Sequence, residues 1–334
     1  MSRRPTIHDV AAAAGVSVST VSKAVNGRYG VSDETIARVL GAVETLGYES
    51  SLVASSMRSR TTGVVGVLVA DFEPFTTEVL KGVGAALRES GHDVLAYAGA
   101  HQSVTGWERR SLQRLSGTLI DAAILVTPTV LTPPGDIPIV AVDPHTGRAD
   151  IPTVEADSYG GARLATEHLI ALGHRRIGFL SGRPDLRSAA LREAGYRQAL
   201  AEAGLPFDPR LVASGRYEAL AAREAAATLV SVEDRPTAVF AANDLSALAF
   251  LEVAAERGIR VPDDISVVGF DDIPEASRRR TRLTTVQQPM GRIGSTAAAL
   301  LMALVRGETP EQTHPILPTR LIERATTAPP PHRL

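Results

Sequence analysis

The chain has 334 residues and is 44% apolar, which is longer than one hydrophobic core usually serves and predicts more than one globular domain. It has no cysteine, which excludes disulfides, thiolate zinc sites and cysteine nucleophiles and fits a reducing compartment. The net charge is −2, but residues 1–60 carry seven Lys or Arg against five Asp or Glu, a weak sign of nucleic-acid contact at the N-terminus. We find no secretory signal and no apolar run of membrane-spanning length, and therefore expect a cytoplasmic protein.

The first sixty residues predict helices alone. Helix boundary signals delimit three of them, over residues 7–14, over residues 18–25, and from residue 33 to an end at Gly47. Thr6, Ser17 and Ser32 stand at the positions of N-caps, and Gly15 follows the first helix as its stop signal. Two short helices joined by a tight turn and braced by a third make a helix-turn-helix.

From residue 61 the pattern changes to short β-branched runs that alternate with amphipathic stretches. The runs cover residues 64–69, 94–97, 122–126, 139–142, 177–180, 238–241 and 265–270. The helical stretches cover residues 76–90, 160–172, 188–203, 219–230 and 245–257. Continuously apolar strands alternating with helices predict doubly wound parallel sheets. Because the elements are too many for one such sheet, we expect two lobes with a cleft between them.

These patterns divide the chain into four parts. We predict a helix-turn-helix domain over residues 1–49, a hinge or linker over 50–61, a two-lobed ligand-binding domain over 62–324, and a flexible tail over 325–334. The tail prediction depends on three consecutive prolines, Pro329 to Pro331, near the C-terminus.

The second helix of a helix-turn-helix enters the major groove of DNA, and its early residues face the base edges. Here these residues are Val18, Ser19 and, one turn later, Lys23. Val18 can contact a thymine methyl, Ser19 can bond to either a donor or an acceptor on a base, and Lys23 can donate to guanine. Phosphate contacts, which position the helix without reading sequence, are assigned to Thr6, Ser17, Thr20, Ser22 and Asn26. The alternative is a three-helix bundle with no nucleic-acid role.

The stretch from Thr6 to Asn26, TIHDVAAAAGVSVSTVSKAVN, resembles the lactose-repressor (LacI/GalR) family, and the match continues through residues 31–39 and Leu46-Gly47-Tyr48. The resemblance covers essentially the whole chain. It implies an N-lobe over residues 62–156 and 291–316 and a C-lobe over 157–288 and 319–324. It implies a dimer, or a tetramer built from dimers, that binds pseudo-palindromic operators in double-stranded DNA. We expect a homodimer, because no leucine-heptad tail follows Arg324.

The family resemblance also implies a hinge helix that forms on DNA and inserts a leucine into the minor groove. This chain departs from that pattern, with Ser50-Ser51, Ala54-Ser55 and Met57 where the family has Pro-Asn, Ala-Arg and the leucine. Methionine is apolar and flexible, so Ala54 and Met57 remain the candidates for the minor-groove contact. A passive linker over residues 51–60 is the alternative.

Ligands of parallel sheets bind beyond the carboxyl ends of the strands. Asp143, Asn243 and Asp271 each follow a predicted strand, and their carboxylate and amide groups suit the vicinal hydroxyls of a sugar. Asp244 and Asp272 also follow strands, but we expect structural roles for them, as for His168 and His174.

The family resemblance implies the same ligand site. The segment 188–196 resembles the one whose arginine contacts effector, which adds Arg192, and residues 240–244, 265–272 and 283–289 match further family signatures. Phe75 and Tyr217 are expected as aromatic walls, and Gln288 is a weaker candidate. Trp107, the only tryptophan, is expected at an interface or on the surface.

The sequence thus predicts a DNA-binding transcriptional repressor whose operator affinity changes when a small ligand, a mono- or disaccharide, binds between the lobes. Neither the sign of that change nor the ligand's identity follows from the sequence, although induction is favoured. The alternatives are a periplasmic-type sugar-binding protein and a sugar-acting enzyme on the same scaffold. Against an enzyme, we find no phosphate loop, metal-ligand cluster or nucleophile elbow, and no dinucleotide fingerprint around Gly82 and Gly84, so no cofactor and no metal are expected.

Overall fold

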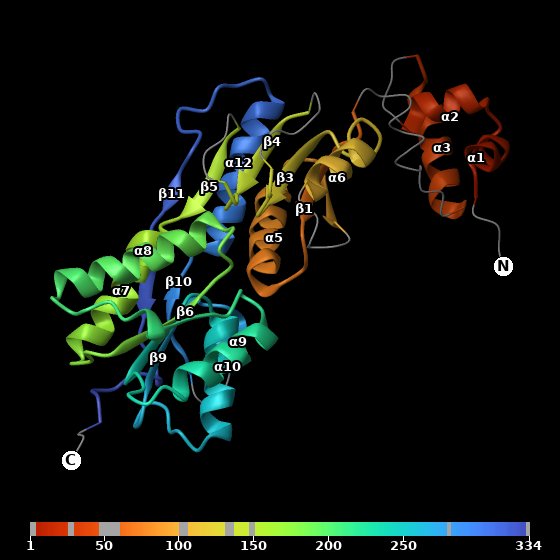
Figure 1. Ribbon diagram of the computed structural model, residues 1–334. Coiled ribbons are helices and arrows are strands. Elements are labelled where there is room, and N and C mark those ends of the chain that lie inside the picture. Colours follow the sequence, from red (N-terminus) through yellow and green to blue (C-terminus); the bar gives the residue numbers. More distant parts are fainter. Residues whose placement is uncertain are drawn as a thin grey trace. The chain divides into compact units, whose positions relative to one another are not determined.

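The computed structural model describes residues 5–25, 30–46, 61–99, 106–130, 137–146, 151–278 and 282–331 (Figure 1). The chain divides into two compact units, a helical one of Met1–Thr62 with the short segment Gly117–Leu119, and a larger α/β one of Gly63–Ser116 and Ile120–Leu334. Among the described residues, no helix combines the length and the apolar character needed to cross a membrane.

The described residues of the N-terminal unit form three helices, α1 (Ile7–Ala14), α2 (Val18–Val25) and α3 (Asp33–Leu46). One residue from each helix, Val10, Val21 and Val39, is fully buried in the small core that they share. The helices begin where the sequence offers caps: Asp9 accepts from the Thr6 backbone N–H at 2.7 Å, and the Thr20 N–H donates to the Ser17 hydroxyl at 3.1 Å. Gly15 ends α1 with a φ of 64°, a conformation that glycine adopts without strain.

The larger unit contains two six-stranded sheets, as the alternation of strands and helices predicts (Figure 1). The first sheet has the order β11 (Ile316–Leu317), β5 (Thr153–Ala156), β4 (Ile139–Val142), β3 (Ala122–Val126), β1 (Val64–Val69) and β2 (Asp93–Ala98). All its neighbouring strands pair in parallel. β1, β3 and β4 are buried along their whole length, as expected for a parallel sheet covered on both faces.

The second sheet has the order β12 (Arg320–Ile322), β10 (Thr284–Gln287), β9 (Ser266–Asp271), β8 (Ala238–Ala241), β6 (Ile177–Ser181) and β7 (Val212–Ser214). Its strands pair in parallel except at the edge, where β12 runs antiparallel to β10. We call the parts of the chain built on the first and second sheets the N-lobe and the C-lobe.

Helices pack on both sheets. The N-lobe helices are α5 (Pro74–Leu87), α6 (Trp107–Leu115) and α12 (Met290–Val305). The C-lobe helices are α7 (Ser158–Ala171), α8 (Arg187–Glu202), α9 (Ala219–Val230), α10 (Asp244–Glu256) and α11 (Pro274–Arg278), with a 3-10 turn over Pro209–Leu211. α5 and α12 lie so close that a Cβ on Gly82 would come within 2.1 Å of the Gly291 carbonyl oxygen, which explains why glycine stands there inside a helix.

The chain passes between the lobes three times, between β5 and α7, between β10 and α12, and between β11 and β12. Two side-chain contacts between described residues also join the lobes. Arg187 on α8 forms an ion pair with Glu155 on β5 at 2.8 Å, and the ring of His145 after β4, whose pKa is lowered by burial, lies 3.4 Å from Asp185 before α8. A ligand between the lobes would therefore bind where the chain already connects them.

The predicted flexible tail over residues 325–334 is wrong for its described part, residues 325–331. Thr326 is fully buried, and its hydroxyl accepts from the Thr284 N–H at 2.8 Å and donates to the Val267 carbonyl at 2.7 Å. The Ala328 carbonyl accepts from the Ser266 hydroxyl at 3.0 Å and lies 2.9 Å from the His174 ring Nε2. The last strand, β12, ends at Ile322, but the segment that follows remains in the C-lobe because its polar groups complete the bonding of β9 and β10.

Candidate functional site

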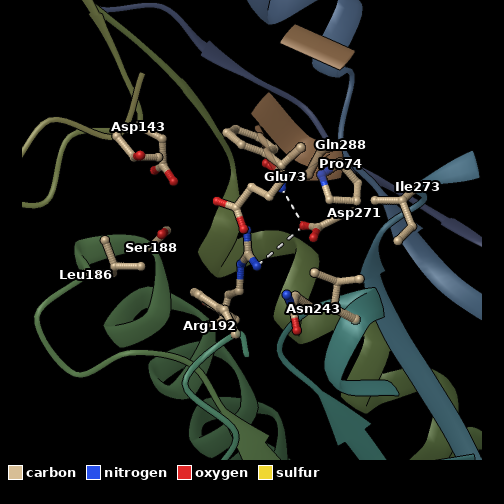
Figure 2. A pocket seen from close by; sticks show the side chains of 14 residues that line it. Glu73, Pro74, Asp143, Leu186, Ser188, Arg192, Asn243, Asp271, Ile273 and Gln288 are labelled. Atoms are coloured by element: carbon tan, nitrogen blue, oxygen red, sulfur yellow. Dashed lines mark hydrogen bonds and ion pairs between the residues drawn. The ribbon is translucent and has the colours of Figure 1, made fainter. Parts of the chain in front are cut away.

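A pocket of about 60 Å³ lies between the carboxyl ends of the two sheets, and we call it the inner pocket (Figure 2). Its lining comprises Glu73, Pro74, Phe75, Thr127, Asp143, Leu186, Ser188, Arg192, Tyr217, Asn243, Leu245, Asp271, Ile273 and Gln288. All seven residues that the sequence predicts as ligand contacts are among them, drawn together from both lobes. Proximity does not test their roles, which remain predictions.

Arg192 extends from α8 into this pocket (Figure 2). Its side chain is only 4% exposed, and its guanidinium lies 3.8 Å over the Phe270 ring. One guanidinium nitrogen donates to the Ala242 carbonyl and lies 3.5 Å from an Asp271 oxygen. The buried Nε–H has no partner among the described residues, so Arg192 retains a donor for a ligand.

Asp271 is the last residue of β9 and faces Arg192. The Gln288 side-chain amide donates to it at 2.7 Å, which holds the carboxyl in position (Figure 2). Burial raises the pKa of Asp271 to about 6, and the charge of Asp143 adds to this rise, whereas Arg192 and Gln288 oppose it. Gln288, the weaker prediction, therefore supports a pocket carboxyl as well as lining the pocket.

Two further carboxyls face the inner pocket from the N-lobe. Burial raises the pKa of Asp143, and the positive charge of Arg192 opposes that rise. Glu73 is largely exposed as a residue, but its carboxyl turns toward the pocket (Figure 2), where the surrounding protein and the charges of Asp271 and Asp71 raise its pKa to about 7. The lining of the pocket thus includes three carboxyls and one guanidinium.

The other predicted contacts contribute an amide and aromatic rings. Asn243 caps α10, because its side-chain oxygen accepts from the Ser246 N–H at 3.0 Å. The side-chain NH2 of Asn243 therefore remains as a donor for a ligand. Tyr217 lies 5.6 Å from the Arg192 guanidinium carbon, and burial raises its pKa to about 12, so the phenol is a neutral donor. Phe75 lines the pocket from the first turn of α5.

Backbone geometry at the strand ends turns side chains into the pocket. Thr127 follows β3 and Asp143 follows β4, with φ angles of 49° and 46°, and Asp271 at the end of β9 has a φ of 118°. Non-glycine residues rarely adopt positive φ, and clusters of them are typical of binding sites. By contrast, the carboxyls of Asp244 and Asp272 serve the fold: Asp244 accepts from Thr285 at 2.6 Å, and Asp272 pairs with Arg324 at 2.6 Å.

Sequence reasoning missed some lining residues, and two of them carried a usable signal. Thr127 directly follows the run 122–126, and Glu73 lies in the loop after 64–69, so the rule that identified Asp143 also applies to both. Ser188 and Leu186 stood at the start of a predicted helix and gave no such signal. The expectation that Trp107 lies at an interface or on the surface is wrong, because it is 2% exposed and packs its ring on the Gly99 backbone.

In the N-terminal unit, α2 presents the expected polar face. Ser19 and Lys23, four residues apart and so on one side of the helix, are exposed, whereas Val21 and Ala24 are buried. Val18 is partly buried and packs against the core, which leaves less of it for a base contact.

The predicted phosphate contacts are also partly engaged within the unit. Thr6 donates to Asp9 at 2.7 Å, the Ser17 and Thr20 hydroxyls are 2.8 Å apart, and Ser22 is partly exposed. Asn26 and the hinge candidates Ala54 and Met57 lie outside the described residues. Within the described part of the chain, no three His, Asp or Glu side chains come together as a metal site.

Fold and pocket define the class of protein: a helix-turn-helix unit joined to a two-lobed domain of the periplasmic-binding-protein type. Residues 6–51 match the family described as bacterial regulatory proteins, lacI family, and residues 166–327 match a periplasmic binding protein-like domain. The chain belongs to the LacI family of bacterial regulatory proteins.

Curated relatives extend over nearly the whole chain. The transcriptional repressor PurR of Photobacterium profundum is 35% identical, covering 92% of this chain and 94% of its own length. The transcriptional regulator CelR of Thermobifida fusca is also 35% identical, covering 96% and 98%.

Solved structures agree with these relatives. A CelR–cellobiose complex has a TM-score of 0.72 and 34% identity, covering 97% of this chain and 100% of its own. The Lac repressor dimer bound to operator and the anti-inducer ONPF has a TM-score of 0.82 and 27% identity, covering 98% and 100%.

Proposed function

We propose that this protein is a homodimeric, sequence-specific transcriptional repressor whose affinity for a pseudo-palindromic operator is set by a neutral sugar bound in the inner pocket. The observation that carries the proposal is that one chain combines an exposed helix-turn-helix surface with a pocket between two lobes that is lined by charged and amide side chains. Neither part alone requires the other. Together they are the parts of a regulator that converts ligand binding into a change of DNA affinity.

The exposed face of α2 supports DNA reading. Ser19 and Lys23 stand one turn apart, and neither side chain is used by the core of the unit. A lysine can donate to both acceptors of guanine in the major groove, and a serine hydroxyl can donate or accept. The Lac repressor structure, in which that protein is bound to operator as a dimer, supports the same use of this surface and the homodimer.

The chemistry of the inner pocket supports a sugar. Carboxyls, an amide and a guanidinium surround it, and such groups bind adjacent hydroxyls as acceptors and donors at once. Phe75 and Tyr217 add rings that can cover the apolar face of a sugar. The structure of CelR with cellobiose shows a sugar on a related protein.

The ligand would act by changing the relative position of the lobes, and with it the separation of the two reading helices in the dimer. Operator half-sites lie at a fixed distance, so displaced helices bind less well. A coupling free energy of about 1–3 kcal/mol changes operator affinity about five- to 150-fold. We propose induction, in which the ligand weakens operator binding.

The test is DNA binding by the full chain, measured by fluorescence anisotropy on a duplex selected from a library of symmetric sequences. We expect the affinity to fall steeply with salt, because the protein displaces counterions from phosphates. Lys23→Ala should lower affinity for the selected duplex about five- to 150-fold but affect a scrambled duplex less. Arg38→Ala, an exposed cation on α3 of the same unit, is the matched control. Failure to prefer any symmetric duplex would overturn the proposal.

A further inference from the structure

A second cavity adjoins the inner pocket, and we call it the outer chamber. It has a volume of about 310 Å³ and shares five lining residues with the inner pocket, Glu73, Thr127, Leu186, Tyr217 and Leu245. Ligand pockets usually measure about 300–1,000 Å³. The inner pocket, at about 60 Å³, falls far below that range and reaches it only together with the outer chamber.

One wall of the outer chamber is the Trp107 side chain at the start of α6. Hydrogen bonds next to Trp107 fix this helix end. The buried Glu108 carboxylate accepts from the Thr129 hydroxyl at 2.9 Å and from the Val130 N–H. The Gly106 N–H donates to the Thr129 hydroxyl oxygen at 2.9 Å. A buried carboxylate with this many partners holds its helix rigidly. The indole is therefore a preformed wall.

Two buried donors at this chamber lack partners among the described residues, the Trp107 Nε1–H and the Tyr217 hydroxyl. Indole is a donor only, so it requires an acceptor oxygen. Tyr217 is held in place by its loop, where Arg216 and Tyr217 both have left-handed backbone, with φ of 53° and 62°. A buried donor without an acceptor is unfavourable, and a ligand that supplies an oxygen removes that cost.

The charges around the two cavities favour a neutral ligand. Asp71, Glu73 and Glu218 line the outer chamber together with Arg183 and Arg216, and Arg183 is already paired with Asp185 at 2.7 Å. The inner pocket adds Asp143 and Asp271 against Arg192. Acidic side chains thus outnumber guanidinium groups around the two cavities, which disfavours an anion such as a sugar phosphate.

We propose that the effector is a neutral carbohydrate of two units, a disaccharide. The hydroxyl-bearing edge of one ring enters the inner pocket, and the second ring lies in the outer chamber, where its oxygens accept from Trp107 and Tyr217. This assignment rests on the proposed sugar-binding function. In it, the outer chamber is the part of the site that distinguishes a disaccharide from a monosaccharide.

The experiment is calorimetric titration of the full-length protein with cellobiose, lactose, maltose, sucrose, trehalose and melibiose, with their constituent monosaccharides, and with a disaccharide phosphate. We expect at least one neutral disaccharide to bind more than about tenfold tighter than either of its monosaccharides. Trp107→Phe, which retains a ring but loses the donor, should weaken that disaccharide about three- to tenfold and change monosaccharide binding less than about twofold.

A second variant guards against a folding defect in the first. Arg216→Ala removes an exposed side chain from the rim of the outer chamber and should also lower the disaccharide-to-monosaccharide affinity ratio. Arg257→Ala, an exposed arginine at the end of α10, makes the same charge change outside both cavities and should leave the ratio unchanged. If Trp107 had only a structural role, Trp107→Phe would weaken the binding of disaccharides and of monosaccharides by the same factor. That result would overturn the proposal.

The proposal is also overturned if a monosaccharide or a nucleobase binds as tightly as any disaccharide, if the phosphate binds best, or if no sugar of the panel binds. These outcomes leave the proposed repressor intact as long as the unliganded protein prefers a symmetric duplex. Loss of that preference would instead overturn the proposed function, whatever the sugar titrations show.

Discussion

Arg192→Ala tests the electrostatics of the inner pocket most directly. The change removes the contact with Asp271 at 3.5 Å, the hydrogen bond to the Ala242 carbonyl and the packing on Phe270. Removing one partner of a buried ion pair costs about 3–5 kcal/mol. We expect the lower end, about 3 kcal/mol at pH 8, because Asp271 already has a raised pKa of about 6 and can take up a proton rather than stay buried as an anion.

The sign of the pH dependence follows from this pKa. Since the folded pKa of Asp271 lies above the ordinary 3.8, the folded state binds more protons than the unfolded state between about pH 4 and pH 6. The free energy of unfolding therefore falls as pH rises through that window. Without Arg192 the folded pKa rises further and the window extends toward pH 8. The stability gap between wild type and variant should therefore be smaller at pH 5 than at pH 8, the part that remains at pH 5 coming from the lost contacts with Ala242 and Phe270.

Scanning calorimetry at pH 5, 6.5 and 8 measures this gap. A loss of about 3 kcal/mol corresponds to a Tm lower by about 6–12 °C for a unit of this size. Arg197→Ala is the matched control on the same helix, because that side chain is 49% exposed and its pair with Glu193 should contribute about 1 kcal/mol or less. A gap that does not change with pH, or that is no larger than for Arg197→Ala, would refute the reasoning.

Three further predictions follow from buried contacts. Gly82→Ala should lower the free energy of unfolding by about 1–3 kcal/mol in urea titrations, because its Cβ would meet the Gly291 carbonyl oxygen at 2.1 Å, whereas Gly84→Ala, with open space around it, should be neutral or stabilising. Thr326→Val should cost about 1–3 kcal/mol in the same titrations, since it leaves the Thr284 N–H without its acceptor, and an unchanged midpoint would contradict this. Glu73→Gln should raise the Tm above that of wild type at pH 8, and the difference should vanish toward pH 4. The reason is that the pKa of Glu73 is raised to about 7 in the folded state, so the unfolding free energy of wild type falls as pH rises from about 4.5 to 7.

Local patterns predicted much of the fold. The bounds of α1, α2 and α3 agree with the capping residues, and the buried strands β1, β3, β4 and β8 begin and end where their apolar runs do. These elements are predictable because a cap or a run of β-branched residues acts within a few positions of the chain.

The elements that sequence did not predict depend on distant partners. β11 and β12 have two and three residues, too few for any periodicity, and exist because β5 and β10 offer them an edge. Residues 325–328 are ordered by hydrogen bonds to Val267, Thr284 and Ser266, which lie about forty to sixty positions earlier in the chain. No local signal announces such contacts.

The same distinction separates the predicted from the missed parts of the site. Asp143, Asn243 and Asp271 were predictable because parallel strands bring their carboxyl ends to one edge. Trp107 was not, because it reaches the outer chamber through a helix whose position depends on the Glu108–Thr129 contact, a pairing across 21 positions.

How strongly a ligand can shift this protein depends on what already holds the lobes together. The pair between Arg187 and the buried Glu155 and the contact between His145 and Asp185 join the lobes without any ligand. A ligand changes the equilibrium between arrangements only by the difference in its affinity for them. A sugar that contacted Arg192, Asn243 and Asp271 alone would bind one lobe and shift nothing. Contacts to Asp143 or Trp107 from the same molecule are what would make binding depend on the position of the lobes, and hence on the operator.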